Sequence, residues 1–278
     1  MDDHDELRTH SPNEDPPPPY SQSSNPPGPG TTSSSATQPQ KPQIQHQLLP
    51  RASVHTTPLF PLSWNLYRSQ SLGRVLMLGA QETGPLYAVS QHSGWSGKPH
   101  MILHSGPSDT LPALAAGIRP ATLGEAQHSI IILPPLPGSS LDSSQELFRA
   151  HAGRPRVTFR FTVVVGTEPS SWRRETFEWR HSYGDAVASL DGARDGWKLV
   201  RSAGVSSVSP SNTSSPVSAT SSDGHELVAV WAYARFSLSK AMKFRFLGSG
   251  ETGALGDRWA IMAVMTALRM FQWQNTSS

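Results

Sequence analysis

Short apolar stretches separated by turn residues follow one another along the chain from about Thr57. In RVTFRFTVVVG, Val157, Phe159 and Phe161 alternate with polar residues, which predicts a β-strand with one buried and one solvent-exposed face. The same alternation occurs in ETFEWRHS, GWKLVRS, HELVAVWAYARF and KFRFLG, where the inward candidates are Phe177, Trp179, Trp197, Leu199, Phe244 and Phe246.

Further strands are predicted earlier in the chain. SLGRVLMLGA, PLYAVSQHSG and KPHMILHSG read as opening strands, with a turn at Gly84-Pro85, and HSIIILPPLPG starts a second group. Residues 145–150 are expected to add a helical turn before the strand that contains Phe159. Many short strands without intervening helices favour an antiparallel all-β domain over βαβ units.

The last apolar stretch, DRWAIMAVMTALRMFQW, predicts one helix over residues 258–273 with Asp257 as its N-cap. Apolar residues cover nearly its whole circumference, and Arg258, Arg269 and Gln272 share one narrow polar strip. A helix that is apolar all round lies inside a protein or inside a membrane. Because a bilayer span needs about 20 residues, we predict a core helix surrounded by the strands, with membrane insertion as the alternative.

The composition divides the chain. Residues 1–56 hold 11 of the 25 prolines, and Tyr20 is the only aromatic residue before Phe60. Such a segment cannot bury enough apolar area to offset its ordering entropy, so a disordered tail is expected over 1–56 and a folded domain over 57–278. Within that domain, residues 202–222 include 12 Ser or Thr and are expected to form a disordered insertion in a hairpin.

Charge and cysteine content exclude several classes of protein. Residues 1–56 carry six acidic and three basic side chains, and the rest carries 15 acidic and 20 basic ones. The domain is only mildly basic, so we expect no nucleic-acid partner, whereas weak attraction to anionic membrane is permitted. The absence of cysteine fits a reducing compartment, and MDDHDELRTH lacks an apolar signal region. We therefore expect a cytoplasmic protein that is either free or peripheral at membranes.

Signatures of cofactor binding and catalysis are weak. Gly248, Gly250 and Gly253 have the G-x-G-x-x-G spacing, but no strand pattern follows the next helix and no acidic residue lies about 20 positions on. The glycines are therefore interpreted as a flexible turn between the last strand and the helix. His100 and His104 lack a third ligand nearby in the sequence and are interpreted as ordinary polar or packed residues. No cofactor, metal or enzymatic activity is expected.

The sharpest motif lies in the tail. Pro17-Pro18-Pro19-Tyr20 is a Pro-Pro-x-Tyr ligand of the kind that WW domains bind. Consecutive prolines hold the polyproline II conformation in advance, so binding costs little ordering entropy. Pro17, Pro18 and Tyr20 are thus the predicted contacts with a WW-domain partner, although four residues in a proline-rich region also arise by chance.

The domain from about Thr57 to Gln274 resembles the tubby C-terminal-like superfamily, which includes phospholipid scramblases and LURP-one-related proteins. The likeness rests on VLMLGAQETGPLYAVS, RVTFRFTVV, ETFEWRHS, ELVAVWA and KFRFLGSGETGALGDRWAIMAVMTALRMFQ. The overall pattern, with its proline-rich acidic leader, is most similar to that of uncharacterised fungal members. The resemblance implies a closed antiparallel barrel of about twelve strands around a hydrophobic C-terminal helix.

The resemblance also bears on function. Scramblases often carry Pro-Pro-x-Tyr motifs in a proline-rich leader, as here. They usually add a cysteine-rich stretch and an acidic calcium-binding segment, both of which this chain lacks, so calcium-driven scrambling is in doubt. Tubby proteins bind phosphoinositide headgroups through basic side chains, for which the local candidates are Lys240, Lys243 and Arg245 in SKAMKFRF. A solvated polar face is the competing interpretation of those three residues.

The leading hypothesis is a non-enzymatic cytoplasmic adaptor, whose tail recruits a WW-domain protein such as a ubiquitin ligase. The alternative is a protein that binds phosphoinositides or anionic membranes, or acts like a scramblase.

Overall fold

The computed structural model describes residues 58–69, 75–93, 96–120, 128–141, 143–152, 157–191, 193–205 and 220–276. The predicted tail, including Pro17, Pro18 and Tyr20, lies outside the described residues.

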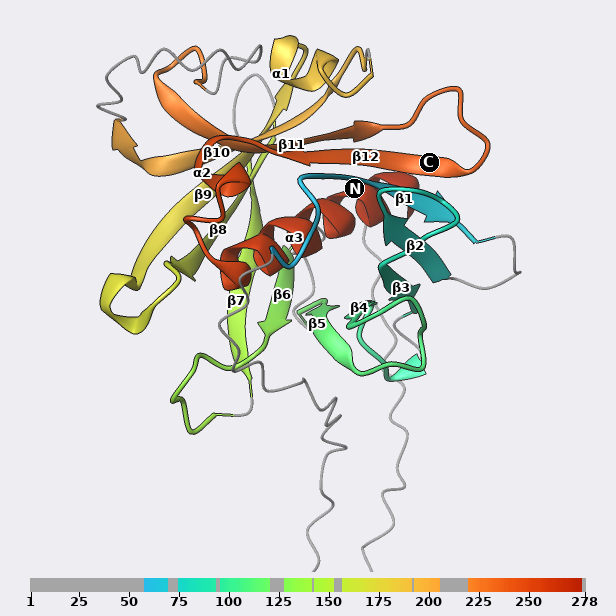
Figure 1. Ribbon diagram of the computed structural model, residues 1–278, viewed down its shortest axis with the longest axis horizontal. Helices are drawn as coiled ribbons and strands as arrows, with labels where there is room; N and C mark the ends of the chain where they lie inside the picture. Colours follow the sequence, from blue (N-terminus) through green and yellow to red (C-terminus); the bar gives the residue numbers. More distant parts are fainter. Residues whose placement is uncertain are drawn as a thin grey trace, which may run out of the picture. The chain divides into compact units, whose positions relative to one another are not determined.

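Twelve antiparallel strands form a closed barrel in which each strand pairs with its neighbours in sequence and β1 closes the ring against β12 (Figure 1). The strands are β1 Ser63–Arg68, β2 Val75–Gly79, β3 Tyr87–Gln91, β4 Met101–His104, β5 Ala113–Ile118, β6 His128–Leu133, β7 Ser144–His151, β8 Thr158–Val165, β9 Arg173–Ser182, β10 Gly196–Val205, β11 His225–Tyr233 and β12 Lys240–Phe246. The short helices are η2 Pro169–Ser171, α1 Asp185–Ala188 and α2 Gly248–Glu251. The predicted all-β fold class is confirmed.

The alternation of the strands places their apolar side chains inside the barrel, as the sequence indicates. All six inward candidates of the later strands are buried, and so are Phe159 and Phe161 on β8. Val157 is the exception, since it precedes β8 and is 40% exposed. The period of two ends with the strand itself, so a residue one position outside it need not follow the pattern.

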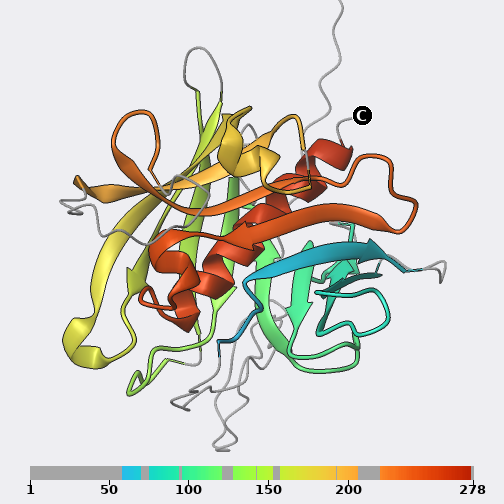
Figure 2. The same cartoon turned by 45° about the horizontal axis from the view of Figure 1, so that its top comes forward.

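Helix α3, Asp257–Thr276, occupies the interior of the barrel (Figures 1 and 2). Every residue from Ile261 to Phe271 is buried, and its apolar members belong to the main core together with side chains of the surrounding strands. Thr266 is satisfied inside this core because its hydroxyl donates to the Met262 carbonyl at 2.9 Å and accepts from the Trp179 indole at 2.9 Å. The predicted core helix is therefore confirmed.

The start of α3 differs from the prediction. Asp257 lies in the first turn of the helix rather than at the cap position, where Gly256 has a φ of 82°. A carboxylate in the first turn still faces the positive end of the helix dipole. The helix also runs a few residues further at its C-terminal end than 273.

The glycines between β12 and α3 form the expected turn, with the short helix α2 at its start. Gly248 and Gly253 have φ values of 51° and 76°, in the left-handed region that glycine tolerates best. A Cβ on Gly250 would lie 2.3 Å from the Val228 carbonyl oxygen. Gly250 is therefore needed for close packing of α2 against β11.

Two local predictions are wrong. Residues 145–150 lie within strand β7, which pairs with β6 and β8. Here buried Glu146 and Phe148 alternate with exposed Gln145 and Arg149, which is the period of a strand. The insertion predicted over 202–222 is too wide, since β10 continues to Val205 and Thr220 bridges to Glu226. The remaining positions of that insertion, 206–219, lie outside the described residues.

Ion pairs across the outer face of β8–β10 hold carboxylates in their charged form. Glu178 accepts from Arg160 Nε at 3.1 Å and from Arg180 Nε at 2.7 Å, and Arg180 also pairs with Asp223. Burial alone would raise the pKa of Glu178, but these arginine hydrogen bonds outweigh burial and hold its pKa below the ordinary value. On the inner side of the same strands, at the register of buried Val163 and Phe177, Arg201 binds Glu175 at 2.8 Å and lowers its pKa in the same way.

We expect Leu268→Ala to lower the free energy of unfolding by about 2–5 kcal/mol, because it opens a cavity in the middle of α3 where Leu268 is fully buried. Urea unfolding followed by tryptophan fluorescence measures the change. The matched control is Leu141→Ala at a 65% exposed site, expected to change stability by less than about 0.5 kcal/mol. Equal effects of the two substitutions would contradict a core position for α3.

Stability is expected to fall as the pH drops below the ordinary glutamate pKa of 4.5, because the folded-state pKa values of Glu175 and Glu178 lie below it. The unfolded chain then binds protons first, so this stabilisation is fully present above pH 4.5 and is lost towards the folded-state pKa. Glu178→Gln should be less stable at pH 7 by about 1–3 kcal/mol. The difference in unfolding free energy between this variant and the wild type should become smaller as the pH falls. Glu82→Gln, at an exposed site, is the control, and a constant deficit at all pH values would refute this role of Glu178.

Candidate functional site

The three predicted cations lie on or at the start of β12, and we call them the β12 face: Lys240, Lys243 and Arg245. Lys243 and Arg245 alternate with buried Phe244 and Phe246, so their side chains lie on the outside of the barrel, as predicted. All three cations are half-buried rather than fully exposed. The prediction of a shared outer face is supported by the backbone register.

A carboxylate that the sequence analysis did not consider lies among these cations. Asp191 Oδ2 is 3.0 Å from Lys243 Nζ, and the Asp191 side chain remains 74% exposed. The hydrogen bond from Lys243 lowers the pKa of Asp191 below its ordinary value, and the charges of Lys240 and Arg245 lower it further. The β12 face therefore keeps an excess of positive charge, with one of its cations paired.

The segment that carries Asp191 is fixed by apolar contacts outside the barrel. Ala186 and Val187 of α1, together with Leu190, pack with buried residues of β10 and β11 in a second small core. This contact brings Ser189 close to the β12 face, where its hydroxyl accepts from Arg245 at 3.5 Å. Two of the three predicted cations thus have partners from this one turn.

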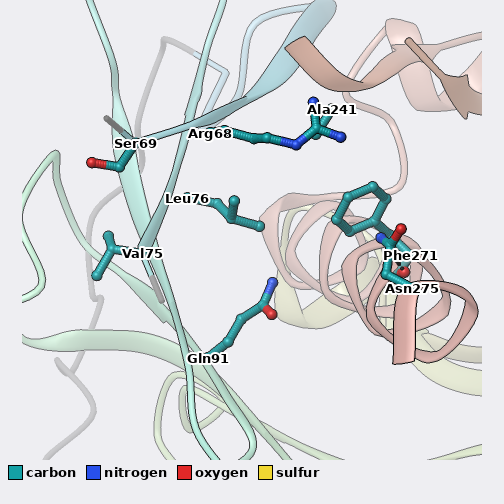
Figure 3. Close-up of a pocket in the computed structure, with 8 residues that line it drawn as sticks. All are labelled: Arg68, Ser69, Val75, Leu76, Gln91, Ala241, Phe271 and Asn275. Carbon is teal, nitrogen blue, oxygen red and sulfur yellow. Dashed lines mark hydrogen bonds between the residues drawn. The ribbon is translucent and has the colours of Figure 1, made fainter. Parts of the chain in front are cut away.

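A pocket of about 330 Å³ opens beside the β12 face, at the barrel end where α3 terminates (Figure 3). The Arg68 guanidinium projects across it towards Ala241, and Arg68 Nη1 donates to the Lys240 carbonyl at 3.3 Å. The pocket is lined by apolar side chains, two amides, a serine and one charged group. The lining residues are Arg68, Ser69, Val75, Leu76, Gln91, Ala241, Phe271 and Asn275. This chemistry suits a small amphipathic group with an anionic end.

The polar strip of α3 faces the barrel wall, where both arginines find acceptors, although Arg258 Nε is buried without a partner among the described residues. Arg258 donates to the Pro134 carbonyl at 2.6 Å near one end of the helix, and Arg269 Nε donates to Ser129 Oγ at 2.9 Å near the other. Burial, followed by the charge of Arg119, lowers the pKa of Arg269 to about 10. The predicted strip exists, but the barrel wall covers it.

Arg269 fits within the wall because of a glycine on β5. A Cβ on Gly117 would lie 2.9 Å from Arg269 Cδ, so any larger residue there would displace the arginine stem. The guanidinium carbon lies 5.1 Å from the centre of the Trp273 ring, a cation–π contact. We interpret Arg269 as an internal structural group rather than a surface for ligands.

The two histidines have structural partners, as predicted. His104 is buried, with Nδ1 2.8 Å from the Leu111 carbonyl and Nε2 2.7 Å from Ser90 Oγ. Since a carbonyl only accepts, Nδ1 carries a proton, and in the neutral ring Nε2 accepts from the Ser90 hydroxyl. His100 Nδ1 accepts from the Arg119 amide at 3.3 Å. In the described ranges, no group of three or more His, Asp or Glu residues is placed to hold a metal ion.

Sequence reasoning missed two residues next to the β12 face. Phe236 was placed at the end of a predicted strand, but β11 ends at Tyr233, and Phe236 lies with Leu238 in the turn before β12. Both side chains are completely exposed. The stretch ARFSLSK contains no Gly, Pro, Asn or Asp, so its two serines are the only usual turn residues that it carries.

Within the part of the chain that the structure describes, no helix combines the length and hydropathy needed to cross a bilayer. The chain matches no protein-family model, no curated protein and no solved structure. The resemblance to the tubby C-terminal-like superfamily therefore stays a prediction, and the identity that the structure establishes is that of a closed twelve-stranded antiparallel barrel built around its C-terminal helix.

Proposed function

We propose that the protein is a non-enzymatic adaptor that recruits a WW-domain protein, such as a ubiquitin ligase, through its N-terminal segment. The observation that carries this proposal is the Pro17–Tyr20 motif, whose tyrosine is the only aromatic residue of the first 59. Two prolines fill the aromatic groove of a WW domain, and the tyrosine fills a second pocket. In the sequence, Glu14 and Asp15 directly precede the proline run that contains the motif.

The architecture of the barrel is compatible with this role. Helix α3 and the aromatic side chains around it fill the interior, so binding by the barrel falls to its outer face and its two ends. An adaptor needs such a stable folded surface beside an accessible peptide motif. The barrel would then select the protein or surface to which the WW-domain partner is brought.

Tyr20→Ala should weaken binding of the full chain to WW domains on the order of tenfold or more, because a buried aromatic anchor contributes about 2 kcal/mol or more. Pull-down on a panel of immobilised WW domains, followed by titration of those that bind, measures the loss. Pro26→Ala is the matched control, since it changes a proline of the same segment outside the motif. Retention of all WW binding by the tyrosine variant would refute the adaptor proposal.

A second candidate function is binding to anionic phospholipid, including phosphoinositides. The observation that favours it is the β12 face, where three cations share one outer surface and Asp191, among the described residues, pairs with Lys243 alone. A cation near an anionic membrane surface contributes about 1 kcal/mol. Arg68 adds a further positive charge at the neighbouring pocket.

Replacing Lys240, Lys243 and Arg245 together by Ala should lower affinity for phosphoinositide-containing vesicles by one to two orders of magnitude, given about 1 kcal/mol for each cation. Asp191→Asn should raise the affinity, because it removes the competing carboxylate. Vesicle co-sedimentation at low and high salt measures both effects. The charge-matched control removes Lys98, Arg119 and Arg149, which are exposed on the β3–β7 side. Equal losses in the two triple variants would indicate a dependence on net charge alone and refute a site on β12.

A further inference from the structure

The turn between β11 and β12 exposes two large apolar side chains at its tip. Phe236 and Leu238 have relative exposures of 107% and 100%, whereas the next most exposed large apolar residue of the described chain, Leu141, reaches 65%. The turn projects beyond the end of the barrel in both views (Figures 1 and 2). Contiguous exposed apolar surface is typical of sites that contact a partner, and these two neighbouring side chains are the candidates for such a site.

The backbone of the turn is held in a conformation that is unfavourable for its sequence. Phe236 has a φ of 61°, in the left-handed region that bulky residues rarely adopt. Such outliers persist where the surroundings impose them, and they cluster at binding sites. Here the strained residue is the one whose side chain is fully directed into solvent.

Hydrogen bonds hold the base of the turn in place. The Ala234 amide donates to the Ala241 carbonyl at 3.1 Å, and the Arg68 amide donates to the Ser239 carbonyl at 2.8 Å. The Ser237 hydroxyl accepts from the Lys240 amide at 2.9 Å. The tip is therefore presented on a fixed base rather than on a long connection.

Positive charge surrounds the base of the turn. Arg235 precedes Phe236 and is 57% exposed while paired with Asp195 at 2.8 Å. Lys240 follows the turn, and Arg68 lies against it through its bond to the Lys240 carbonyl. An apolar tip above a cationic base matches the profile of an anionic bilayer, in which acyl chains lie below negatively charged headgroups.

We propose that this turn inserts Phe236 and Leu238 into the surface of an anionic membrane, while Lys240, Arg68 and the rest of the β12 face contact the headgroups. The proposal deepens the lipid-binding candidate and rests on it. A protruding convex tip enters a bilayer without a preformed cavity, whereas a protein partner would need a matching pocket. The partner that fits this tip is therefore a membrane that contains anionic lipid.

The absence of cysteine from the chain allows a direct test. Full-length Leu238→Cys, labelled with an environment-sensitive fluorophore, is mixed with vesicles of phosphatidylcholine alone or with phosphatidylserine or phosphoinositide. We expect a blue-shifted emission and quenching by acyl-chain quenchers on the anionic vesicles only. Leu141→Cys, labelled in the same way, is the matched control and should show neither change.

Affinity gives a second readout. Replacement of Phe236 and Leu238 by Ser should lower affinity for anionic vesicles at least about tenfold, equivalent to about 1.4 kcal/mol. Phe236→Trp with Leu238→Ile should preserve it. Because the native side chains are fully exposed, the serine variant should unfold at the same urea concentration as the wild type, which separates lost insertion from lost folding.

The outcomes separate the two proposals. Vesicle binding with unchanged emission from position 238, or with unchanged affinity of the serine variant, overturns insertion and leaves headgroup binding in place. No binding of the wild type to any anionic vesicle overturns both. Loss of a protein partner by the serine variant, with vesicle binding intact, would assign the turn to a protein interface and also overturn insertion.

Discussion

Burial of an apolar helix inside a ring of strands is the constraint on which the structure depends. From Ile261 to Phe271 every side chain of α3 is buried, so no face of this part of the helix is available to solvent. A two-layer packing covers only one side of a helix, whereas a closed barrel covers all of it. Closure also removes the free strand edges through which β-proteins aggregate. The ring of strands shields α3 from solvent, and α3 in turn covers the inward apolar side chains of the strands.

The polar strip of α3 adds specificity to this burial. A helix that is apolar on every side has little to fix its rotation about its own axis. Arg258 and Arg269 bind acceptors on or beside β6 at opposite ends of the helix, and Gly117 leaves space for the stem of Arg269. A rotation of α3 would leave two guanidinium groups buried without acceptors, which is costly. The buried charges thus select one orientation of α3 inside the barrel.

The sequence predicts those features that arise from local periodicity, and it misses those that depend on the meeting of distant segments. Alternation identifies the inward aromatic residues, and the uninterrupted apolar run identifies the core helix. The contact between Lys243 and Asp191 escapes notice because it depends on how the turn after α1 packs against β10 and β11. The turn at Phe236 is missed because its base is held by hydrogen bonds to β1 and β12, which local sequence does not reveal, and because serine is the only usual turn residue in it. Position on a face was thus predictable, but the charge environment of that face was not.

Closure of the ring has a consequence for synthesis of the protein. The barrel is sealed by pairing of β1 with β12, exemplified by the bond from Ser63 to Phe244, which are 181 positions apart. The helix that fills the interior follows β12, so the nascent chain exposes its inward aromatic residues until these last elements leave the ribosome. Contacts between such distant positions also slow folding, because a long loop must close first. The emerging polypeptide therefore exposes apolar surface of the kind that chaperones bind in general, and a chain ending before α3 would lack the helix that covers the inward face of the sheet.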